Sequence, residues 1–310
     1  RCEPRAEEPG TTSSVAMHKD SATGGIIATA PARQSSCSTW SAGSSSSDGT
    51  PPREGASGIS LEGHPDHLTA EQAETLAAML ARFAEHELPP RWRNEEMMCR
   101  FLRARAWNLD LAAEMLESCL QWRKAFNYPG GVDALLHFEY PEELAVRAAY
   151  PESFHKTDLW GRPVLLQLVG KIDMPAVKQA TTWDRLRAYN LYRMEHNLQV
   201  KYPVCSKLTG TRVGESLIIV DLKGFRPLMF TPEVRDYLKG HFKIMQDNYP
   251  ERLGKMFVIN APMVFAAVWN VLKKFVDVKT RNRVEILGSK YKAKLLEVID
   301  ERSLPTFLGG

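Results

Sequence analysis

The chain has 310 residues, 44% of them apolar and 25% charged, and its formal net charge is +3. It is long and apolar enough to bury a substantial core in one or two domains. The net charge is too small to indicate a nucleic-acid partner, and no apolar run is long enough to cross a membrane. The five cysteines are widely spaced and form no C-x-x-C pair. We therefore expect a reducing compartment and no metal site or other cofactor.

Residues 1–66 differ in composition from the rest of the chain. They contain 13 serines, 8 glycines and 6 prolines but almost no large apolar side chains, so we predict a disordered lead that cannot offset the entropy lost on folding. The remainder holds 35 basic and 29 acidic residues, a net charge of +6. This charge suits an anionic membrane surface or a phosphate ligand, although ordinary surface charge explains it as well. Because the first residue is arginine and not methionine, we also expect the sequence to be part of a longer chain.

Helical signals begin at Thr69. Thr69-Ala-Glu-Gln72 is a capping-box pattern, and apolar residues at helical spacing follow it as far as about Glu87. Asn94 is a suitable cap for a second helix, and a third helix is predicted from about Asp110 to Phe126. We therefore predict a small helical unit over residues 67–128.

From residue 139 onward, predicted strands alternate with predicted helices. The strands are expected at 164–169, 216–220, 256–259 and 284–287, and the helices at 141–148, 181–202, 231–249, 263–277 and 291–300. This alternation is typical of an α/β domain with a mostly parallel sheet. We assign residues 139–310 to that domain.

The predicted helix over residues 263–277 is unusually apolar. Its polar residues share one narrow stripe, and the rest of its circumference is apolar, including Phe265, Trp269, Leu272 and Phe275. A helix that lies on a sheet needs an apolar arc of only about 100° to bury its contact face. Two interpretations stay open: a core helix covered on both sides, or a helix whose inner face lines an apolar cavity and whose outer face meets a bilayer.

Charged residues flank this helix in the sequence. Glu251 and Arg252 precede the strand that leads into it, and Thr280, Arg281 and Arg283 follow it. Arginine binds phosphate through two parallel hydrogen bonds, and a partly buried arginine needs a carboxylate such as Glu251 beside it. These residues form either a polar collar at the mouth of an apolar pocket, suited to an amphiphile with a phosphate head, or surface ion pairs at the strand ends.

No catalytic motif accompanies these patterns. The sequence has no G-x-x-x-x-G-K-[ST], G-x-G-x-x-G, G-x-S-x-G or H-E-x-x-H pattern. His155 and Asp158 lie together, but no nucleophile sits near them in a recognisable turn. We therefore expect no catalytic residues and no enzyme.

Eight short motifs occur in an order that resembles one known family. They are Phe101-Leu-Arg-Ala-Arg105, Trp122-Arg-Lys124, His155-Lys-Thr-Asp158, Gly161-Arg-Pro163, Asp221-Leu-Lys-Gly224, Tyr249-Pro-Glu-Arg252 with Gly254-Lys255, Ile259-Asn-Ala-Pro262, and Leu304-Pro to Gly309-Gly310. Over about residues 68–310 the sequence thereby resembles the CRAL-TRIO family, and within it the yeast-type phosphatidylinositol/phosphatidylcholine transfer proteins. The resemblance implies a CRAL-TRIO N-terminal helical unit, then a lipid-binding α/β domain in which the helix over 263–277 is a gate above the lipid cavity.

The resemblance also implies site residues. Those matching the family's phosphoinositide-head positions are Arg105, Asp158, Glu251, Arg252, Thr280 and Arg283. In the family, hydroxyl groups on the buried strand and several tyrosines hold a second lipid with a choline head. Here Ser216 is kept, whereas apolar residues occupy the other positions: Ile218, Leu165, Met194 and Phe154. Losing four polar contacts of about 0.5–1.5 kcal/mol each should weaken the selection of a choline head.

The resemblance therefore implies a monomeric, cytosolic protein that binds phosphatidylinositol and a second hydrophobic ligand other than phosphatidylcholine. It would contact Golgi, endosomal or plasma membranes transiently, transfer lipid between membranes or present it to lipid kinases, and bind no nucleic acid. Three alternatives stay open: a non-transferring module that recruits partners to membranes, a carrier of a sterol, tocopherol or retinoid, and an enzyme that acts on lipid.

Overall fold

The computed structural model describes residues 62–89 and 92–310. The predicted disordered lead, residues 1–66, therefore lies outside the described residues except for its last five positions. In that short piece the Gly63 carbonyl accepts a hydrogen bond of 2.8 Å from the Arg103 guanidinium. The helical part of the protein thus has contacts upstream of residue 67, where we expected it to begin.

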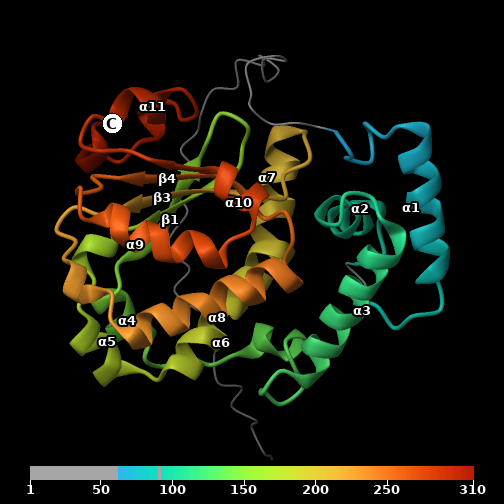
Figure 1. The fold of residues 1–310 in the computed structure, drawn as a ribbon, viewed down its shortest axis with the longest axis horizontal. Helices are drawn as coiled ribbons and strands as arrows, with labels where there is room; N and C mark the ends of the chain where they lie inside the picture. Colours follow the sequence, from blue (N-terminus) through green and yellow to red (C-terminus); the bar gives the residue numbers. More distant parts are fainter. Residues whose placement is uncertain (1–61, 90–91) are drawn as a thin grey trace, which may run out of the picture. The chain divides into compact units, whose positions relative to one another are not determined.

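Three helices follow in the order that the sequence predicts (Figure 1). They are α1 (Ala70–Arg82), α2 (Glu95–Ala104) and α3 (Leu109–Ala125). Thr69 forms the predicted capping box with Gln72, and Asn94 caps α2 by accepting a hydrogen bond from the Met97 amide. The first helix ends several residues before the predicted Glu87.

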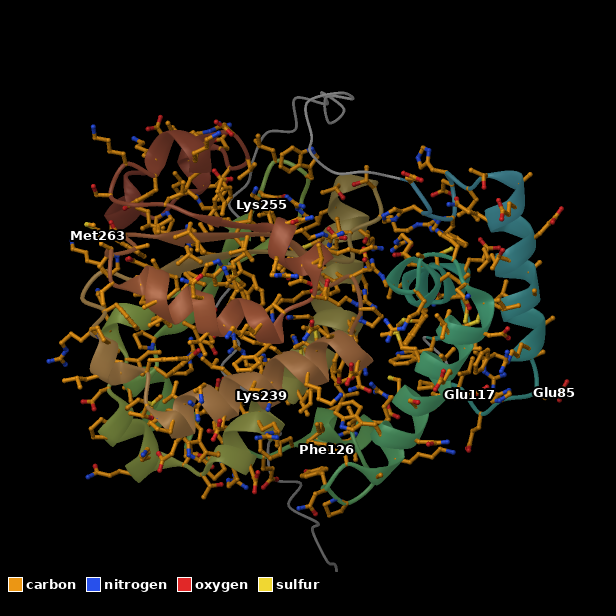
Figure 2. All side chains as sticks on the ribbon, viewed as in Figure 1. Glu85, Glu117, Phe126, Lys239, Lys255 and Met263 are labelled. Atoms are coloured by element: carbon orange, nitrogen blue, oxygen red, sulfur yellow. The ribbon has the colours of Figure 1, made fainter. Side chains whose placement is uncertain are left out.

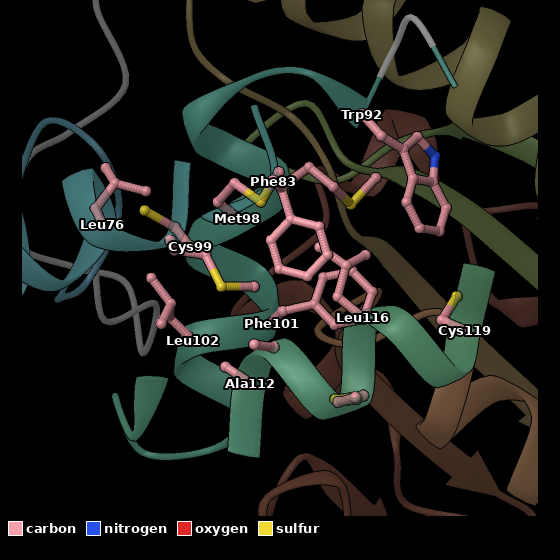
Figure 3. Close-up of a cluster of buried hydrophobic side chains, with 14 of the residues drawn as sticks. Leu76, Phe83, Trp92, Met98, Cys99, Phe101, Leu102, Ala112, Leu116 and Cys119 are labelled. Carbon is pink, nitrogen blue, oxygen red and sulfur yellow. The ribbon is translucent and has the colours of Figure 1, made fainter. Parts of the chain in front are cut away.

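These helices share a hydrophobic core of their own (Figure 3). Phe101 and Leu102 of α2 and Leu116 of α3 are completely buried, and Phe83, just after α1, joins the same cluster. Burying one such side chain contributes about 1.5–3 kcal/mol. This shared core is the physical reason why apolar residues recur at helical spacing through this part of the sequence.

The rest of the chain is built on a five-stranded sheet in which the strands lie side by side in their sequence order. They are β1 (Glu152–Thr157), β2 (Pro163–Gln167), β3 (Ser216–Asp221), β4 (Leu253–Ile259) and β5 (Val284–Ile286). The first two strands are antiparallel and the remaining neighbours are parallel, which confirms the predicted α/β fold with a mostly parallel sheet. The sequence does not predict β1, because its residues Glu-Ser-Phe-His-Lys-Thr contain no apolar run.

One face of the sheet is packed tightly. Leu217, Ile219 and Phe257 project to this face and are at most 1% exposed. They pack against α11 (Lys292–Leu296) and the segment that follows it. This helix is shorter than the predicted 291–300, and the chain continues beyond it in short helical turns.

Helices that precede β1 or connect the later strands cover the opposite face. They are α4 (Glu143–Ala149), α5 (Met174–Ala180), α6 (Trp183–His196), α7 (Tyr202–Thr209), α8 (Pro232–Asn248), α9 (Phe265–Leu272) and α10 (Val278–Asn282). Figure 1 shows α8 and α9 side by side, on the side of the sheet away from α11. The predicted helix 181–202 is extended, because α6 continues through a π-helical turn into α7, which Pro203 helps to start. The sequence does not predict α5 and α10, which are too short for a helical period to be recognised.

The predicted apolar helix 263–277 consists of α9 and one 3₁₀ turn, Lys273–Phe275. After this turn, Asp277 caps α10 by accepting a hydrogen bond from the Thr280 amide. We keep the name gate helix for residues 263–277. Across the described ranges 62–89 and 92–310, every helix falls short of the length and apolarity that crossing a bilayer requires.

A buried ion pair joins α3 to α6. The Arg123 side chain is 1% exposed and donates hydrogen bonds to Glu195 at 2.8 Å and to Asp133 at 2.5 Å. The Tyr249 hydroxyl donates another hydrogen bond of 2.7 Å to Glu195, and the guanidinium lies 4.7 Å from the centre of the Trp92 ring. Because a buried charge is costly unless it is paired, this contact fixes how the helical unit meets the sheet domain.

We expect Arg123→Met to lower the free energy of unfolding by about 3–5 kcal/mol, because it leaves the Glu195 carboxylate buried without this guanidinium. Lys124→Met is the matched control, since Lys124 and its partner Glu87 are 70% and 88% exposed and such pairs contribute about 1 kcal/mol or less. Urea unfolding followed by circular dichroism measures both variants. Equal losses of stability would contradict the importance of the buried pair.

Candidate functional site

A row of five side chains crosses the whole sheet on the face that α9 covers. Its members are paired neighbours from β1 to β5: Phe154, Leu165, Ile218, Met256 and Val284. Paired residues of neighbouring strands project to the same face. The five therefore form one continuous apolar surface, which we call the sheet floor.

The sheet floor is not packed like the opposite face. All five side chains keep accessible surface, although Ile218 lies on the central strand. In the part of the chain that the structure describes, Phe154, Leu165 and Ile218 belong to none of the buried apolar clusters. Protein interiors are close-packed with few voids. At the two ends of the floor, however, cations lie over the Phe154 ring and Met256 packs against the α9 cluster. The protein's own side chains therefore leave the space above the middle of the floor, at Leu165 and Ile218, unfilled.

The helix α8 also lacks a solid core beneath it. Of its 17 residues only Asn248 is buried, whereas a helix on a filled core buries one whole face. Its apolar residues Leu238 and Phe242 are partly exposed and belong to none of the buried clusters among the described residues. We call the region between the sheet floor, α8 and α9 the interior space.

The gate helix packs on the sheet most tightly in its first half. Phe265 and Val268 are buried against the sheet. The predicted gate residues beyond them are only partly buried: Trp269, Leu272 and Phe275. Trp269 and Leu272 pack against the same cluster as Phe265 and Val268 but keep accessible surface. The gate helix is thus packed less tightly toward its far end.

Gln246 of α8 holds the far end of the gate helix. Its side-chain amide donates a hydrogen bond of 2.8 Å to the Phe275 carbonyl, and its oxygen accepts one of 2.6 Å from the Asp277 amide. These two bonds fix the chain where the 3₁₀ turn ends and α10 begins. We call Gln246 the latch.

The near end of the gate helix presents apolar side chains outward. Met263 is 97% exposed at the edge of the domain (Figure 2), and Val264 beside it is 46% exposed. Pro262, Phe265 and Trp269 line a neighbouring pocket of about 290 Å³. The gate helix therefore has apolar residues toward the protein and toward solvent.

Charged side chains stand at one edge of the sheet, one at the end of each strand. They are Asp158 after β1, Arg162 before β2, Glu215 before β3, Glu251 before β4 and Arg283 before β5. Because β1 runs antiparallel to the other strands, these five positions lie at the same edge. We call them the charge row.

Opposite charges meet along the charge row. Arg283 lies 3.0 Å from the Glu251 carboxylate and 3.5 Å from that of Glu215. Arg162 lies 3.9 Å from the Glu215 carboxylate and 2.6 Å from that of Asp158. The structure thus brings three predicted site residues into one network of ion pairs.

Access to solvent differs along the charge row. The Asp158 side chain is 0% exposed, and its oxygens accept hydrogen bonds from Arg162 and from the Trp160 amide. Arg283 is 30% exposed, more than the other members. An incoming ligand can therefore reach Arg283, whereas Asp158 acts by holding Arg162 in place.

The helix α2 holds Glu251. The backbone of Glu251 has a φ of +56°, a conformation that costs a non-glycine residue on the order of 1–3 kcal/mol. The Arg100 guanidinium donates a hydrogen bond to the Glu251 carbonyl, and Arg103 lies 3.8 Å from its carboxylate. Two arginines of the helical unit therefore position the residue that pairs with Arg283.

Three predicted head-binding residues lie outside the charge row. Arg105 donates a hydrogen bond of 3.2 Å to a carbonyl of its own helix, and Thr280 lies in α10. Arg252 and Arg100 both line a separate pocket of about 170 Å³. There burial and the neighbouring Arg100 charge lower the pKa of Arg252 to about 9. The structure therefore does not bring the six predicted residues into a single cluster.

Two predicted second-ligand residues are not members of the sheet floor. The Ser216 hydroxyl, at the start of β3, is 3.0 Å from the Tyr202 hydroxyl, so it already takes part in a hydrogen bond. Met194 of α6 packs, partly buried, against the cluster that contains Leu191. The five side chains of the sheet floor itself are all apolar.

Sequence reasoning missed Arg103, Arg162 and Glu215 as members of the site. Arg162 and Glu215 carry one signal in the sequence, since each directly precedes a buried strand. The sequence spacing does not distinguish Arg103 from Arg105 as the partner of Glu251. Only the packing of α2 decides which of the two arginines contacts it.

The sheet floor, the gate helix above it and the charge row together suit an amphiphilic ligand. They belong to an α/β domain that follows a helical unit in the chain. Family models agree with this class: residues 148–310 match the CRAL/TRIO domain, and residues 37–118 match the CRAL/TRIO, N-terminal domain. The chain belongs to the CRAL-TRIO family, which confirms the resemblance that the sequence motifs indicate.

Individual relatives support the same assignment. The Sec14 cytosolic factor of Schizosaccharomyces pombe is 40% identical over 249 residues, which cover 80% of this chain and 85% of that protein. The phosphatidylinositol/phosphatidylcholine transfer protein SFH7 of Arabidopsis thaliana is 41% identical over 224 residues, or 72% of this chain. The match covers only 40% of SFH7, so the chain spans less than half of that relative. The crystal structure of Sfh5 is similar with a TM-score of 0.56 and 17% identity, covering 72% of this chain and 82% of Sfh5, which supports the fold alone.

We expect Gln246→Leu to speed hydrogen exchange of the Asp277 amide about 5- to 30-fold, because it removes both latch hydrogen bonds, each worth about 1 kcal/mol. Gln246→Glu keeps an acceptor for this amide and should have a smaller effect. Gln121→Leu, at an exposed position of α3, is the control. Exchange that is equally slow in all variants would show that Gln246 does not hold the gate helix.

His241 of α8 makes stability depend on pH. Partial burial and the neighbouring Arg187 charge lower its pKa from 6.5 to about 4, and its ring stacks on that of Tyr237. Between these pKa values the unfolded chain binds the proton and the folded chain does not, so stability falls as the pH decreases from 6.5 to about 4.

At pH 5 this effect should amount to about 2 kcal/mol relative to pH 7. We expect His241→Gln to lose that part of the difference in urea unfolding measured at the two pH values. His86→Gln, at an exposed position, should keep it. An unchanged difference in His241→Gln would contradict the assignment.

Proposed function

We propose that this protein binds phosphatidylinositol and transfers it between membranes or presents it to lipid kinases. The observation that carries the proposal is the Arg283–Glu251 pair, which stands at the edge of an apolar sheet floor that the protein does not fill. A lipid with an anionic head and apolar chains fits both surfaces at once. The names of the relatives, Sec14 cytosolic factor and phosphatidylinositol/phosphatidylcholine transfer protein, support the same class of ligand.

Arg283 is the principal contact for the phosphate of the head, because its guanidinium offers paired N–H donors and is the most exposed member of the charge row. Glu251 orients Arg283 and accepts hydrogen bonds from inositol hydroxyls. Thr280 and Arg105 lie outside the charge row, so they contact the head only where it extends beyond Arg283. Arg252 meets the head only if the lipid reaches the second pocket, which that side chain lines.

The acyl chains occupy the interior space and cover the sheet floor. Removing apolar surface from water contributes about 25 cal/mol per Å², so the floor gains stability from the chains that cover it. Movement of the gate helix away from the sheet admits the lipid, and the exposed Met263 contacts the bilayer during transfer. No covalent bond is made or broken.

The proposal includes the setting in which transfer takes place. The protein acts as a monomer in the cytosol and contacts Golgi, endosomal or plasma membranes only transiently. The name of the Schizosaccharomyces pombe relative, Sec14 cytosolic factor, supports this location.

Transfer of labelled phosphatidylinositol from donor to acceptor vesicles tests the proposal. Arg283→Ala and Glu251→Ala should each lower the transfer rate about tenfold or more, since hydrogen bonds to charged groups are worth about 1.5–3 kcal/mol, and both variants should keep the circular dichroism spectrum of the folded protein. Arg302→Ala is the control, because this arginine is 90% exposed and pairs with Asp300, which is not a member of the charge row.

Unchanged transfer in both charge-row variants would remove these residues from the site. Recovery of only a sterol, tocopherol or retinoid from the purified protein would replace phosphatidylinositol as the ligand. A protein that retains phosphatidylinositol but moves none between vesicles would instead be a module that recruits partners to membranes.

A further inference from the structure

Phe154 is the one aromatic member of the sheet floor, and two cations of the protein lie against its ring. The Lys201 ammonium is 4.2 Å from the ring centre, and the Arg193 guanidinium is 5.9 Å from it. Arg193 belongs to α6, and Lys201 ends the π-helical turn that follows α6. The chain therefore supplies its own cations to this ring.

Both cations are held in place by polar contacts. The Arg193 guanidinium pairs with the Glu152 carboxylate, which is 7% exposed and also accepts a hydrogen bond of 3.0 Å from Gln167. The Lys201 ammonium donates a hydrogen bond of 3.1 Å to the Asn197 side chain. These are anchored groups at the β1 end of the sheet floor and not surface side chains that swing freely.

A choline head would have to compete with these cations. Choline carries a quaternary ammonium, which has no N–H donor and which proteins bind through the faces of aromatic rings. Here a protein ammonium lies within cation–π distance of the Phe154 ring, and like charges repel. The nearby Ser216 hydroxyl is engaged with Tyr202, and Leu165 and Ile218 offer no polar atom. The position is therefore unsuited to phosphatidylcholine.

The same two cations suit a different polar group. A lysine ammonium and an arginine guanidinium carry only hydrogen-bond donors, and they bind phosphate and carboxylate oxygens through charge-assisted hydrogen bonds. The aliphatic residues of the floor, Leu165, Ile218 and Met256, continue from this point across the sheet and can contact an acyl chain. Donors at one end and apolar surface beyond it fit an anionic lipid.

We propose that, besides phosphatidylinositol, the interior space takes a lipid whose polar end is an anionic hydrogen-bond acceptor, a phosphate monoester or a carboxylate, at Lys201 and Arg193, and that it rejects choline lipids. This inference rests on the proposed function, because it names the second ligand of the same interior space.

The test is a competition between lipids for the full chain. The protein is incubated with vesicles that contain equal amounts of phosphatidylinositol, phosphatidylcholine, phosphatidic acid and oleic acid, is separated from them, and its bound lipids are quantified by mass spectrometry. The wild-type chain should retain phosphatidylcholine at about a tenth or less of the amount of phosphatidic acid or oleic acid, whichever is bound better. A predominance of phosphatidic acid identifies the phosphate monoester, and a predominance of oleic acid identifies the carboxylate.

Lys201→Met frees one face of the Phe154 ring, so the share of phosphatidylcholine should rise about tenfold. Lys207→Met, at an exposed position of α7, is the matched control and should leave the shares unchanged. Adding Phe154→Leu to Lys201→Met should abolish the rise, since the aromatic face is then missing. A purely structural role of Lys201 would not make the rise depend on the ring.

Each outcome decides the inference. A wild-type chain that retains phosphatidylinositol and takes phosphatidylcholine as readily as the anionic lipids overturns the inference and leaves the proposed function standing. A rise that persists without the Phe154 ring also overturns it. A chain that retains none of the phospholipids overturns the proposed function and this inference together.

Discussion

The constraint on which the structure depends is an apolar sheet face that its covering helices do not pack against as a solid core. The two faces of the same strands make the contrast clear. Leu217 and Phe257 are completely buried on the side of α11, whereas Ile218 and Met256, the next residues along, keep accessible surface on the other side. Apolar surface left in contact with water costs about 25 cal/mol per Å² relative to burial. The sheet floor therefore favours any ligand with apolar chains that fits beneath α8 and α9.

The charge row gives this apolar space a polar border and links it to the helical unit. Arg100 and Arg103 of α2 hold Glu251, which in turn pairs with Arg283. The short helix α10 connects the charge row to the gate helix. The amide of its cap residue Asp277 donates a hydrogen bond to Gln246, and Arg283 directly follows the helix. Lys279 of α10 donates a hydrogen bond of 2.6 Å to the Arg103 carbonyl. The helical unit, the head site and the end of the gate helix are thus joined within a few residues.

Much of the fold could be predicted from the sequence, because apolar runs and caps are local signals. The buried strand 216–220, the capping box at Thr69 and the α8 helix are confirmed. The strand β1 could not be predicted, since its residues are mostly polar and it is recognised only by its pairing with β2. The site divides in the same way. Glu251, Arg283 and Glu215 are charged residues beside apolar runs, a pattern that is visible in the sequence. Arg103 joins them only through tertiary packing, which no spacing in the sequence reveals.

The most direct test of the account is the mass of the intact protein under non-denaturing conditions after purification from lipid-containing cells. If the interior space is a binding site for amphiphiles, the spectrum should show the chain with one phospholipid molecule, and mild denaturation should release that lipid. A folded protein that appears only at the mass of the bare chain, even after incubation with phosphatidylinositol vesicles, would contradict the central claim.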